Sequence, residues 1–339
     1  MIEDRLATGK LPLEVLASLL RCCPIRDPRV LVGPRVGEDA AVIDFGDRLL
    51  VAKSDPITFA TDRIGWYAVH VNANDIATTG AAPRWLLITL LLPETTATQQ
   101  MAEGIMNQVA EACRTLGVTV VGGHTEVSFG LDRPLVVGHM LGEVARDRLV
   151  QTGGAQVGDA VLLLGGVAVE GASLIARELS ARARAAGVSE ATLAEARGYL
   201  DDPGISVVRA AQVATGAARV HAMHDPTEGG VATALHELAW AAGAGIEVWE
   251  DTIPILPACA RLCATLHADP LGLIASGALL AAVAPQDIPA VMAACRDAGI
   301  ACAHIGEVRP QEAGAFLVSR GARRPLPRFD RDEIARLLE

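Results

Sequence analysis

Four aspartates that stand beside glycine or next to apolar runs are the residues of this sequence best suited to do chemistry. Gly37-Glu38-Asp39 precedes an apolar run, Asp55 ends one, Asp75 lies inside an apolar helical pattern, and Asp225 falls between a predicted strand and a predicted helix. A lone aspartate is more often a cap, and Asp75 could be a buried acid that Asn72 or the backbone satisfies. Together, however, several buried carboxylates are costly unless cations neutralise them. Because Mg²⁺ prefers oxygen ligands and bridges carboxylates to phosphates, the set favours a Mg²⁺–phosphate site.

Two other side chains could act beside these acids. Lys53 stands two residues before Asp55, so it points to the same strand face, where it could meet a phosphate or form an ordinary ion pair. His124 follows the glycine pair Gly122-Gly123 and could donate to a phosphate or substrate, or act as an acid or base near neutral pH. A histidine that hydrogen-bonds within its own turn is the plainer alternative.

Several other catalytic and nucleotide-binding signatures are missing from the sequence. It contains no G-x-x-x-x-G-K-[ST], no G-x-G-x-x-G behind a strand, no H-E-x-x-H and no G-x-S-x-G. The run from Gly165 to Gly171 could present backbone N–H groups to an anion, although a plain tight turn is the simpler interpretation.

Short apolar runs alternate with helical patterns along the chain, and this alternation predicts an α/β (α+β) protein. The predicted strands and helices must position the residues named above. The first half is expected to hold strands at 49–52, 85–92, 118–121 and 135–144, and helices at 64–79 and 101–116. Asp55 then follows a strand, and Gly122-Gly123 stops another. One face of the first helix carries small and polar residues, which suggests that it lines a site: Ala68, Asn72, Asp75 and Thr79.

A second round of alternation begins after residues 151–158, where the composition shifts to Gly, Ala and Gln. Strands are expected at 161–164, 220–223, 279–283 and 300–305, and helices at 170–186, 190–215 with a break at Pro203-Gly204, 231–242 and 288–298. The length of 339 residues also favours two domains, for which we predict the boundaries 1–152 and 153–339.

The composition excludes several classes of protein. A formal charge of −11 without a Lys/Arg run argues against nucleic acid and anionic membranes, so a bound polyanion such as ATP would need metal cations. Seven scattered cysteines indicate reduced thiols, and Cys259 and Cys263 lack the second pair that zinc needs. The charged start, residues 1–5, resembles no signal peptide, and the uncharged stretch 271–286 is too short to span a bilayer. We therefore expect a cytoplasmic protein.

The motifs follow one another in an order that is specific as a set. They are Gly37-Glu38-Asp39-Ala40-Ala41-Val42, Ser54-Asp55, Arg63-Ile64-Gly65, Asn74-Asp75-Ile76-Ala77, Gly80-Ala81-Ala82-Pro83, Gly122-Gly123-His124-Thr125 and Asp225-Pro226-Thr227-Glu228-Gly229-Gly230. From about residue 33 to 308 the chain resembles the aminoimidazole-ribonucleotide (AIR) synthetase-like superfamily. This superfamily includes thiamine-monophosphate kinase, selenophosphate synthetase and the hydrogenase-maturation carbamoyl dehydratase.

The resemblance implies a two-domain AIR synthetase-like fold, in which an N-terminal sheet domain binds ATP and dimerises and a C-terminal α/β domain accompanies it. It implies that Mg²⁺ ions hold the ATP phosphates on four acids: Asp39, Asp55, Asp75 and Asp225. It also implies cofactor contacts at small and polar motif residues: Gly37, Asn74, Gly122, Gly123, Thr227, Gly229 and Gly230. His124 and Lys53 are the catalytic candidates.

Departures from the motifs of individual members indicate which branch of the superfamily this chain resembles most. The elements Asn74-Asp75 and Asp225-Pro226-Thr227 resemble the carbamoyl dehydratase best, but that enzyme carries its substrate on a C-terminal cysteine, and the last cysteine here is Cys302. Thiamine-monophosphate kinase usually has Asp at the position of His124. Selenophosphate synthetase has an early Cys/Lys loop, whereas Cys22-Cys23 has no lysine nearby. The best match is the AIR synthase-related group close to the hydrogenase-maturation branch.

We therefore expect a homodimeric, Mg²⁺-dependent enzyme that transfers the γ-phosphoryl group of ATP to a small carbonyl or amide substrate, or activates the substrate with it. Such a reaction needs positioning and charge neutralisation more than a protein nucleophile. The acceptor would be a small molecule or a group borne by a partner protein, in a pathway related to hydrogenase maturation. The alternatives are a non-catalytic nucleotide-binding maturation factor and a thiamine-monophosphate kinase.

Overall fold

The computed structural model describes residues 11, 13–22, 24–57, 60 and 62–338, and it divides into two compact units. Unit 1 comprises the described part of residues 1–26 together with 34–38 and 150–338, and unit 2 comprises residues 27–33 and the described part of 39–149. Residues 1–5, on which the expectation of no signal peptide rests, and Cys23 lie outside the described residues.

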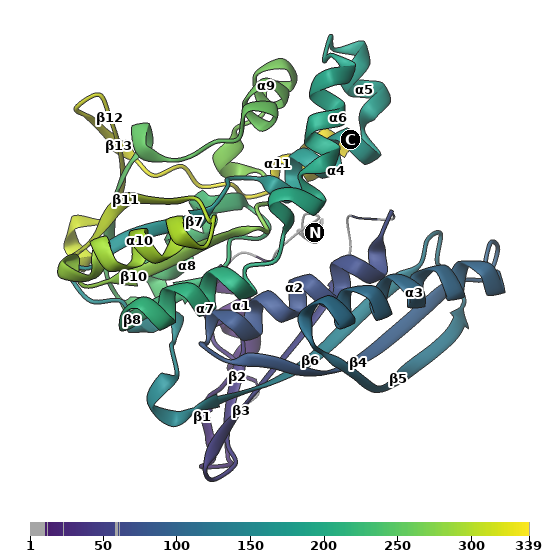
Figure 1. Ribbon diagram of the computed structural model, residues 1–339, viewed down its shortest axis with the longest axis horizontal. Coiled ribbons are helices and arrows are strands. Elements are labelled where there is room, and N and C mark those ends of the chain that lie inside the picture. The colour runs from purple at the N-terminus through teal and green to yellow at the C-terminus, as the bar shows by residue number, and fades with distance from the viewer. Residues whose placement is uncertain (1–10, 12, 23, 58–59, 61, 339) are drawn as a thin grey trace, which may run out of the picture. The chain divides into compact units, whose positions relative to one another are not determined.

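Unit 2 is a six-stranded sheet with two helices packed on it (Figure 1). The strand order is β1-β2-β3-β6-β4-β5, and among the pairs only β4 and β5 run parallel. The strands are β1 (Val30–Val32), β2 (Ala41–Asp44), β3 (Arg48–Ile57), β4 (Ala82–Pro93), β5 (Thr119–Ser128) and β6 (Leu135–Ala145). The helices are α2 (Ile64–Thr78) and α3 (Gln99–Leu116).

Helix α2 lies against the sheet because two glycines of β6 leave room for it. A Cβ atom at Gly138 would lie 2.4 Å from Asn72 Nδ2, and one at Gly142 would lie 2.3 Å from Ile76 Cγ2. The helix face that carries Asn72 and Asp75 is therefore buried against the sheet. All four residues of the face that was predicted to line a site are buried: Ala68, Asn72, Asp75 and Thr79.

The two faces of the unit 2 sheet differ. Along β6, Val136 and Met140 are fully buried on the face that α2 covers, whereas Val137 and Leu141 on the other face are partly exposed. Strand β5 forms the edge of the sheet, and nearly all its residues are exposed. The face opposite α2 is called the open face below.

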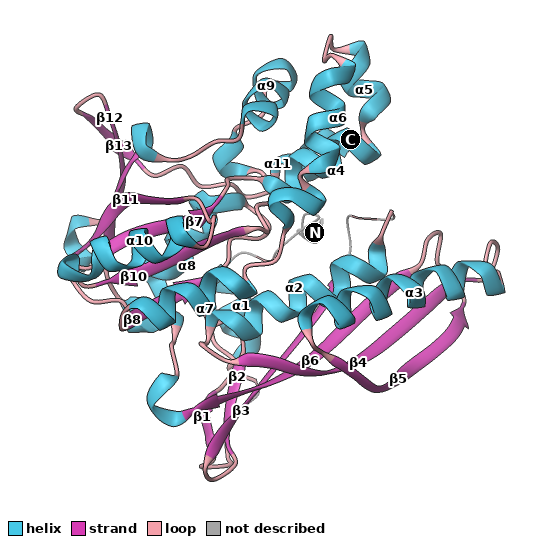
Figure 2. Cartoon of the chain, viewed as in Figure 1, coloured by secondary structure: helices cyan, strands magenta, loops and turns pink. Residues whose placement is uncertain are grey.

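Unit 1 is a seven-stranded sheet of order β13-β12-β9-β11-β7-β10-β8, and helices surround it (Figure 2). The strands are β7 (Ala160–Gly165), β8 (Val220–His224), β9 (Gly245–Trp249), β10 (Ala278–Val283), β11 (Cys302–Arg309), β12 (Ala315–Ser319) and β13 (Ala322–Pro325). The helices are α1 (Leu13–Leu20), α4 (Val169–Glu178), α5 (Ser180–Ala185), α6 (Glu190–Gly198), α7 (Val208–Ala217), α8 (Gly230–Ala242), α9 (Pro257–Leu266), α10 (Ile288–Asp297) and α11 (Glu333–Leu338). The apolar strands β7 and β10 form the centre of its core, with almost every residue buried.

Two predicted strand ends that adjoin the motif residues are wrong. Strand β3 continues through Asp55 to Ile57, and β5 continues through Gly122-Gly123 to Ser128. A Cβ atom at Gly123 would lie 1.9 Å from the carbonyl oxygen of Ile88, so this glycine lets the neighbouring strand approach rather than stopping its own. The predicted helix 170–186 is divided into α4 and α5, and 190–215 into α6 and α7 around the predicted break. Among the described helices, none combines the length and apolar character needed to cross a membrane.

Candidate functional site

The centre of the candidate site in unit 2 is Lys53, which lies between two carboxylates. Its Nζ is 3.3 Å from Asp55 Oδ2 on the same strand and 3.3 Å from Asp75 Oδ2 on α2. The Asp75 side chain is only 5% exposed, whereas those of Lys53 and Asp55 are 21% and 32% exposed. Alternation along β3 thus brings Lys53 and Asp55 to the same face, and the ordinary ion pair left open by the sequence is present.

Asn72 fixes the strand that carries these residues. Its Oδ1 accepts a hydrogen bond from the backbone N–H of Asp55 at 2.9 Å, and its Nδ2 donates to the carbonyl oxygens of Asp55 at 3.2 Å and Ala68 at 2.8 Å. The sequence suggested Asn72 as a partner of Asp75, but the amide instead holds the backbone of Asp55. Asn74, the predicted cofactor contact on the same helix, is fully buried.

His124 lies on the other face of the same sheet. It pairs with Thr89 of β4, which pairs with Val137 on the open face of β6, whereas Lys53 pairs with Met140 on the face under α2. Partners in a ladder share a face, so unit 2 does not bring the two catalytic candidates together. His124 Nε2 instead lies 3.1 Å from Glu126 Oε2, and both side chains are at least half exposed. The plainer alternative, a histidine that hydrogen-bonds within its own turn, is therefore close to what is observed. The partner Glu126 is two residues away, but both residues lie in a strand and not in a turn.

The second group of predicted residues lies at one edge of the unit 1 sheet. Strand β10 runs antiparallel to both β7 and β8, with Ala278 opposite Gly165 and Leu280 opposite His224. The loop that follows β7, the loop 225–230 that follows β8, and the segment that precedes β10 therefore meet at this edge. Asp225 is 2% exposed there, and its neighbour His224 lies 2.9 Å from the buried Glu237 carboxylate.

Backbone contacts give the loop 225–230 its shape. Gly229 and Gly230 have φ values of +79° and +66°, and a Cβ atom at Gly230 would lie 2.4 Å from the carbonyl oxygen of Leu271. The carbonyl oxygen of Thr227 accepts hydrogen bonds from the N–H groups of Gly230 at 3.0 Å and Ala275 at 3.3 Å. Two of the three predicted cofactor contacts of this loop, Thr227 and Gly230, thus pack against the segment before β10.

Within the run 165–171, several N–H groups already donate to backbone carbonyl oxygens and are not free for an anion. The N–H of Glu170 donates to the carbonyl oxygen of Ser276 at 3.3 Å, and that of Gly171 donates to Ile274 at 3.0 Å. The tight turn that the sequence favoured is therefore the better description of this run.

The predicted residues Gly37 and Asp39 lie in the loop that precedes β2. Asp39 is 9% exposed in the loop before β2, so unit 2 contains three of the four predicted metal ligands and unit 1 contains Asp225. Gly37 has a φ of +86°, and a Cβ atom there would lie 2.9 Å from Cβ of Ala241 on α8. Close packing is thus a sufficient reason for glycine at position 37.

Sequence patterns gave no signal for two buried acids beside the loop 225–230. Glu170, in the first turn of α4, is 5% exposed, and burial and the nearby acids Glu228 and Asp332 raise its pKa to about 8. Asp332, near the end of the chain, is 3% exposed, and burial raises its pKa to about 7 against three backbone hydrogen bonds that lower it. Only the position of Glu170 beside apolar residues could have drawn attention to it.

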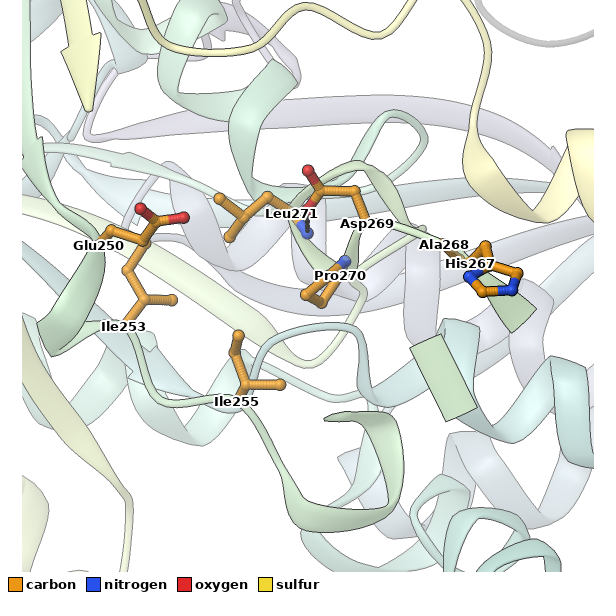
Figure 3. Close-up of a pocket in the computed structure, with 8 residues that line it drawn as sticks. All are labelled: Glu250, Ile253, Ile255, His267, Ala268, Asp269, Pro270 and Leu271. Carbon is orange, nitrogen blue, oxygen red and sulfur yellow. Dashed lines mark hydrogen bonds between the residues drawn. The ribbon is translucent and has the colours of Figure 1, made fainter. Parts of the chain in front are cut away.

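A hollow of about 440 Å³ in unit 1 contains none of the predicted residues (Figure 3). Figure 3 shows Glu250 and Ile253 at one side of it and His267 at the other. Asp269 accepts a hydrogen bond from the N–H of Leu271 at 2.9 Å, and Glu250 pairs with Arg324 at 2.7 Å, so both acids already have partners. We assign no function to this hollow.

Comparison with known proteins identifies similar chains over most of the length. The pattern of the AIR synthase related protein N-terminal domain matches residues 37–144, and that of the C-terminal domain matches residues 156–319. A hydrogenase expression/formation protein of Methanocaldococcus jannaschii, MJ0676, is 30% identical over 83% of this chain and 82% of its own. Carbamoyl dehydratase HypE of Rhizobium leguminosarum bv. viciae is 30% identical over 81% and 77%. A crystal structure of the hydrogenase maturation protein HypE in complex with ATP has a TM-score of 0.71 at 24% identity, over 94% of this chain and 90% of that one.

Proposed function

Because this chain belongs to the AIR synthase related protein family, we propose that it is a Mg²⁺-dependent enzyme that uses ATP to phosphorylate or activate a small carbonyl or amide group. The predicted family, the two-domain α/β fold and the assignment as an enzyme are confirmed by the relatives. The reaction, the use of Mg²⁺ and the site residues are our proposal, as are the functional boundaries 1–152 and 153–339.

The observation that carries the proposal is the Lys53–Asp55–Asp75 cluster. The two carboxylates offer only oxygen ligands, as Mg²⁺ prefers, and they already face a cation in the form of the Lys53 ammonium. A bound Mg²⁺ would neutralise the phosphates and the acids together. Asp39 in unit 2 and Asp225 in unit 1 are further proposed metal ligands, each within its own unit, and the glycines and Thr227 of the motifs are the proposed cofactor contacts.

Each residue of the cluster has a distinct proposed role. Asp55 and Asp75 bind the metal through their carboxylate oxygens, and Asn72 keeps Asp55 in place through its backbone. Without nucleotide, the Lys53 ammonium neutralises the charge of Asp55 and Asp75. When a metal ion neutralises these carboxylates instead, Lys53 is free to contact a phosphate oxygen. His124 stays a candidate acid or base, but because it lies on the face opposite Lys53, we assign it no step at this cluster.

The hydrogenase-maturation branch suggests the acceptor. Relatives in it include a protein named carbamoyl dehydratase, so a carbamoyl-type amide is the acceptor class that we propose. It would be presented as a small molecule or on a partner protein. We place the reaction in the cytoplasm.

Titration of ATP by calorimetry with and without Mg²⁺, with ADP and phosphate measured in the same samples, tests the proposed function. We expect ATP to bind only with Mg²⁺ and ADP to be released slowly, because several carboxylates would repel the phosphates of the metal-free nucleotide. ATP binding of equal strength in excess EDTA, or no binding at all, would contradict the metal-based site.

We also propose that a second copy of the chain covers the open face of the unit 2 sheet. Leu87, Leu91, Val137 and Leu141 form an apolar group on this face and are only partly buried. An exposed apolar sheet face of this kind is typical of an interface.

Light scattering should therefore give twice the mass of one chain. We expect Leu91→Glu to give a folded monomer, and Gln100→Glu, on an exposed part of α3, to remain a dimer. A monomeric wild-type protein would contradict this interface.

A further inference from the structure

The last described residues of unit 1, 326–338, form a segment that we call the C-terminal strap. It ends in α11, which packs against α4 (Figure 1). Ile334 and Leu337 are each 1% exposed, the ring of Phe329 would lie 2.4 Å from a Cβ atom at Gly272, and Arg336 donates to the carbonyl oxygen of His267 at 2.8 Å. The strap thus has several anchors that do not involve the loop 225–230.

One side chain of the strap has a different role. Asp332 Oδ2 accepts the backbone N–H of Gly229 at 2.6 Å, and its Oδ1 accepts the N–H groups of Ile274 at 3.2 Å and Ile334 at 2.7 Å. The carboxylate therefore joins the loop 225–230, the segment before β10 and the first turn of α11. It is 103 residues from Gly229 and 58 from Ile274, so only the folded chain brings these groups together.

The bond to Gly229 is important for the shape of the loop. Gly229 precedes α8 and has a φ of +79°, a left-handed backbone conformation that residues with a side chain rarely adopt. A buried N–H group without a partner is costly, and Asp332 supplies the partner here. Asp225, a proposed metal ligand, and Thr227, a proposed cofactor contact, lie four and two residues before this bond.

We propose that Asp332 is a positioning residue, whose carboxylate holds the loop 225–230 in the shape that Mg²⁺–ATP binding requires. This inference rests on the proposed function, because the value of a fixed loop depends on the ligand that it binds. Asp332 touches neither nucleotide nor metal in this proposal and acts through the N–H of Gly229.

The test uses two variants of Asp332 and two controls in the full chain. Asp332→Asn keeps an oxygen for the Oδ1 contacts but replaces the acceptor at Gly229 by an NH₂ group, and Asp332→Ala removes all three contacts. Asp330→Asn changes an exposed acid two residues earlier, and Arg336→Ala loosens the strap at its contact with His267. Hydrogen exchange of the peptides that contain residues 225–235 and 270–278 is measured without ligand, and Mg²⁺–ATP affinity is measured by calorimetry.

We expect both Asp332 variants to speed exchange in residues 225–235 by at least 10-fold and to weaken Mg²⁺–ATP binding by at least 10-fold. Asp330→Asn and Arg336→Ala should leave both quantities within 2-fold of wild type. If Asp332→Ala does not fold, Asp332→Asn alone decides. Unchanged exchange in both peptides, equal effects of Arg336→Ala and Asp332→Asn, or faster exchange with unchanged ATP affinity would each overturn the proposal. If the wild type binds no ATP, the proposed function fails, whereas the exchange data still decide whether Asp332 holds the loop.

Discussion

Replacing Asp75 by Asn is expected to abolish Mg²⁺-dependent ATP turnover, with a loss of at least about 100-fold in kcat/KM, or about 2.7 kcal/mol. Asn keeps the size of the side chain but removes the negative charge, and in our proposal Asp75 binds the metal through that charge. Because the Asp75 side chain is only 5% exposed, water can substitute for the lost ligand poorly. Initial rates of ADP release at saturating Mg²⁺ measure the effect.

Asp132→Asn is the matched control, since Asp132 is an exposed acid of the same unit. This variant should keep wild-type turnover, and thermal unfolding should show that both proteins are folded. Turnover of the Asp75 variant within 3-fold of wild type would remove Asp75 from the metal site. In that case the Lys53–Asp55–Asp75 cluster would be an ion pair that only stabilises the fold.

Replacing Glu170 by Gln is expected to stabilise the protein at alkaline pH and to leave its stability nearly unchanged at pH 5. Burial, with the charges of Glu228 and Asp332, raises the pKa of Glu170 from 4.5 to about 8. In the part of the chain that the structure describes, no Lys or Arg pairs with Glu170, and its Oε2 has no hydrogen-bond partner. The folded protein therefore keeps a proton on Glu170 that the unfolded chain releases.

The direction of the pH dependence follows from this difference in bound protons. Above pH 4.5 the unfolded chain loses the proton while the folded protein retains it up to about pH 8, so stability falls across this window and levels off above it. One unit of difference in pKa corresponds to about 1.4 kcal/mol, so the total loss is on the order of 5 kcal/mol. Gln has no proton to lose and avoids this penalty.

Urea unfolding at pH 5 and pH 8.5 measures the effect of Glu170→Gln. Glu312→Gln, at an exposed position of the same unit, is the control and should follow the wild type at both pH values. The wild type and the Glu170 variant should differ by several kcal/mol at pH 8.5 only. Equal stability of the two at pH 8.5 would mean that Glu170 is ionised at little cost in the folded protein, and the explanation by burial would be wrong.

Local patterns predicted the elements that their own residues stabilise. The helix predicted at 64–79 is observed at Ile64–Thr78, and the strand predicted at 135–144 is observed at Leu135–Ala145, because Gly80 and Pro83 mark the end of the helix and an apolar run marks the strand. The same patterns missed β1, β2, β9, β12 and β13, which are short or lie at sheet edges. These patterns also predicted that β5 ends at Gly122-Gly123. The glycine at 123 instead leaves room for the backbone of Ile88 on the neighbouring strand, which the sequence does not show.

At the site, local spacing was enough to place neighbouring residues on one face of a strand or helix. The two-residue spacing of Lys53 and Asp55 already set them on one strand face, and the ordered motifs identified the family. Local spacing did not show which of these residues meet in the folded chain. Strand register set His124 on the face opposite Lys53, and chain crossings brought Asp332 to Gly229 over 103 residues. Spacing along a chain fixes neighbours within one helix or strand, whereas contacts between distant segments depend on how sheets pair and pack, and no local pattern encodes that pairing.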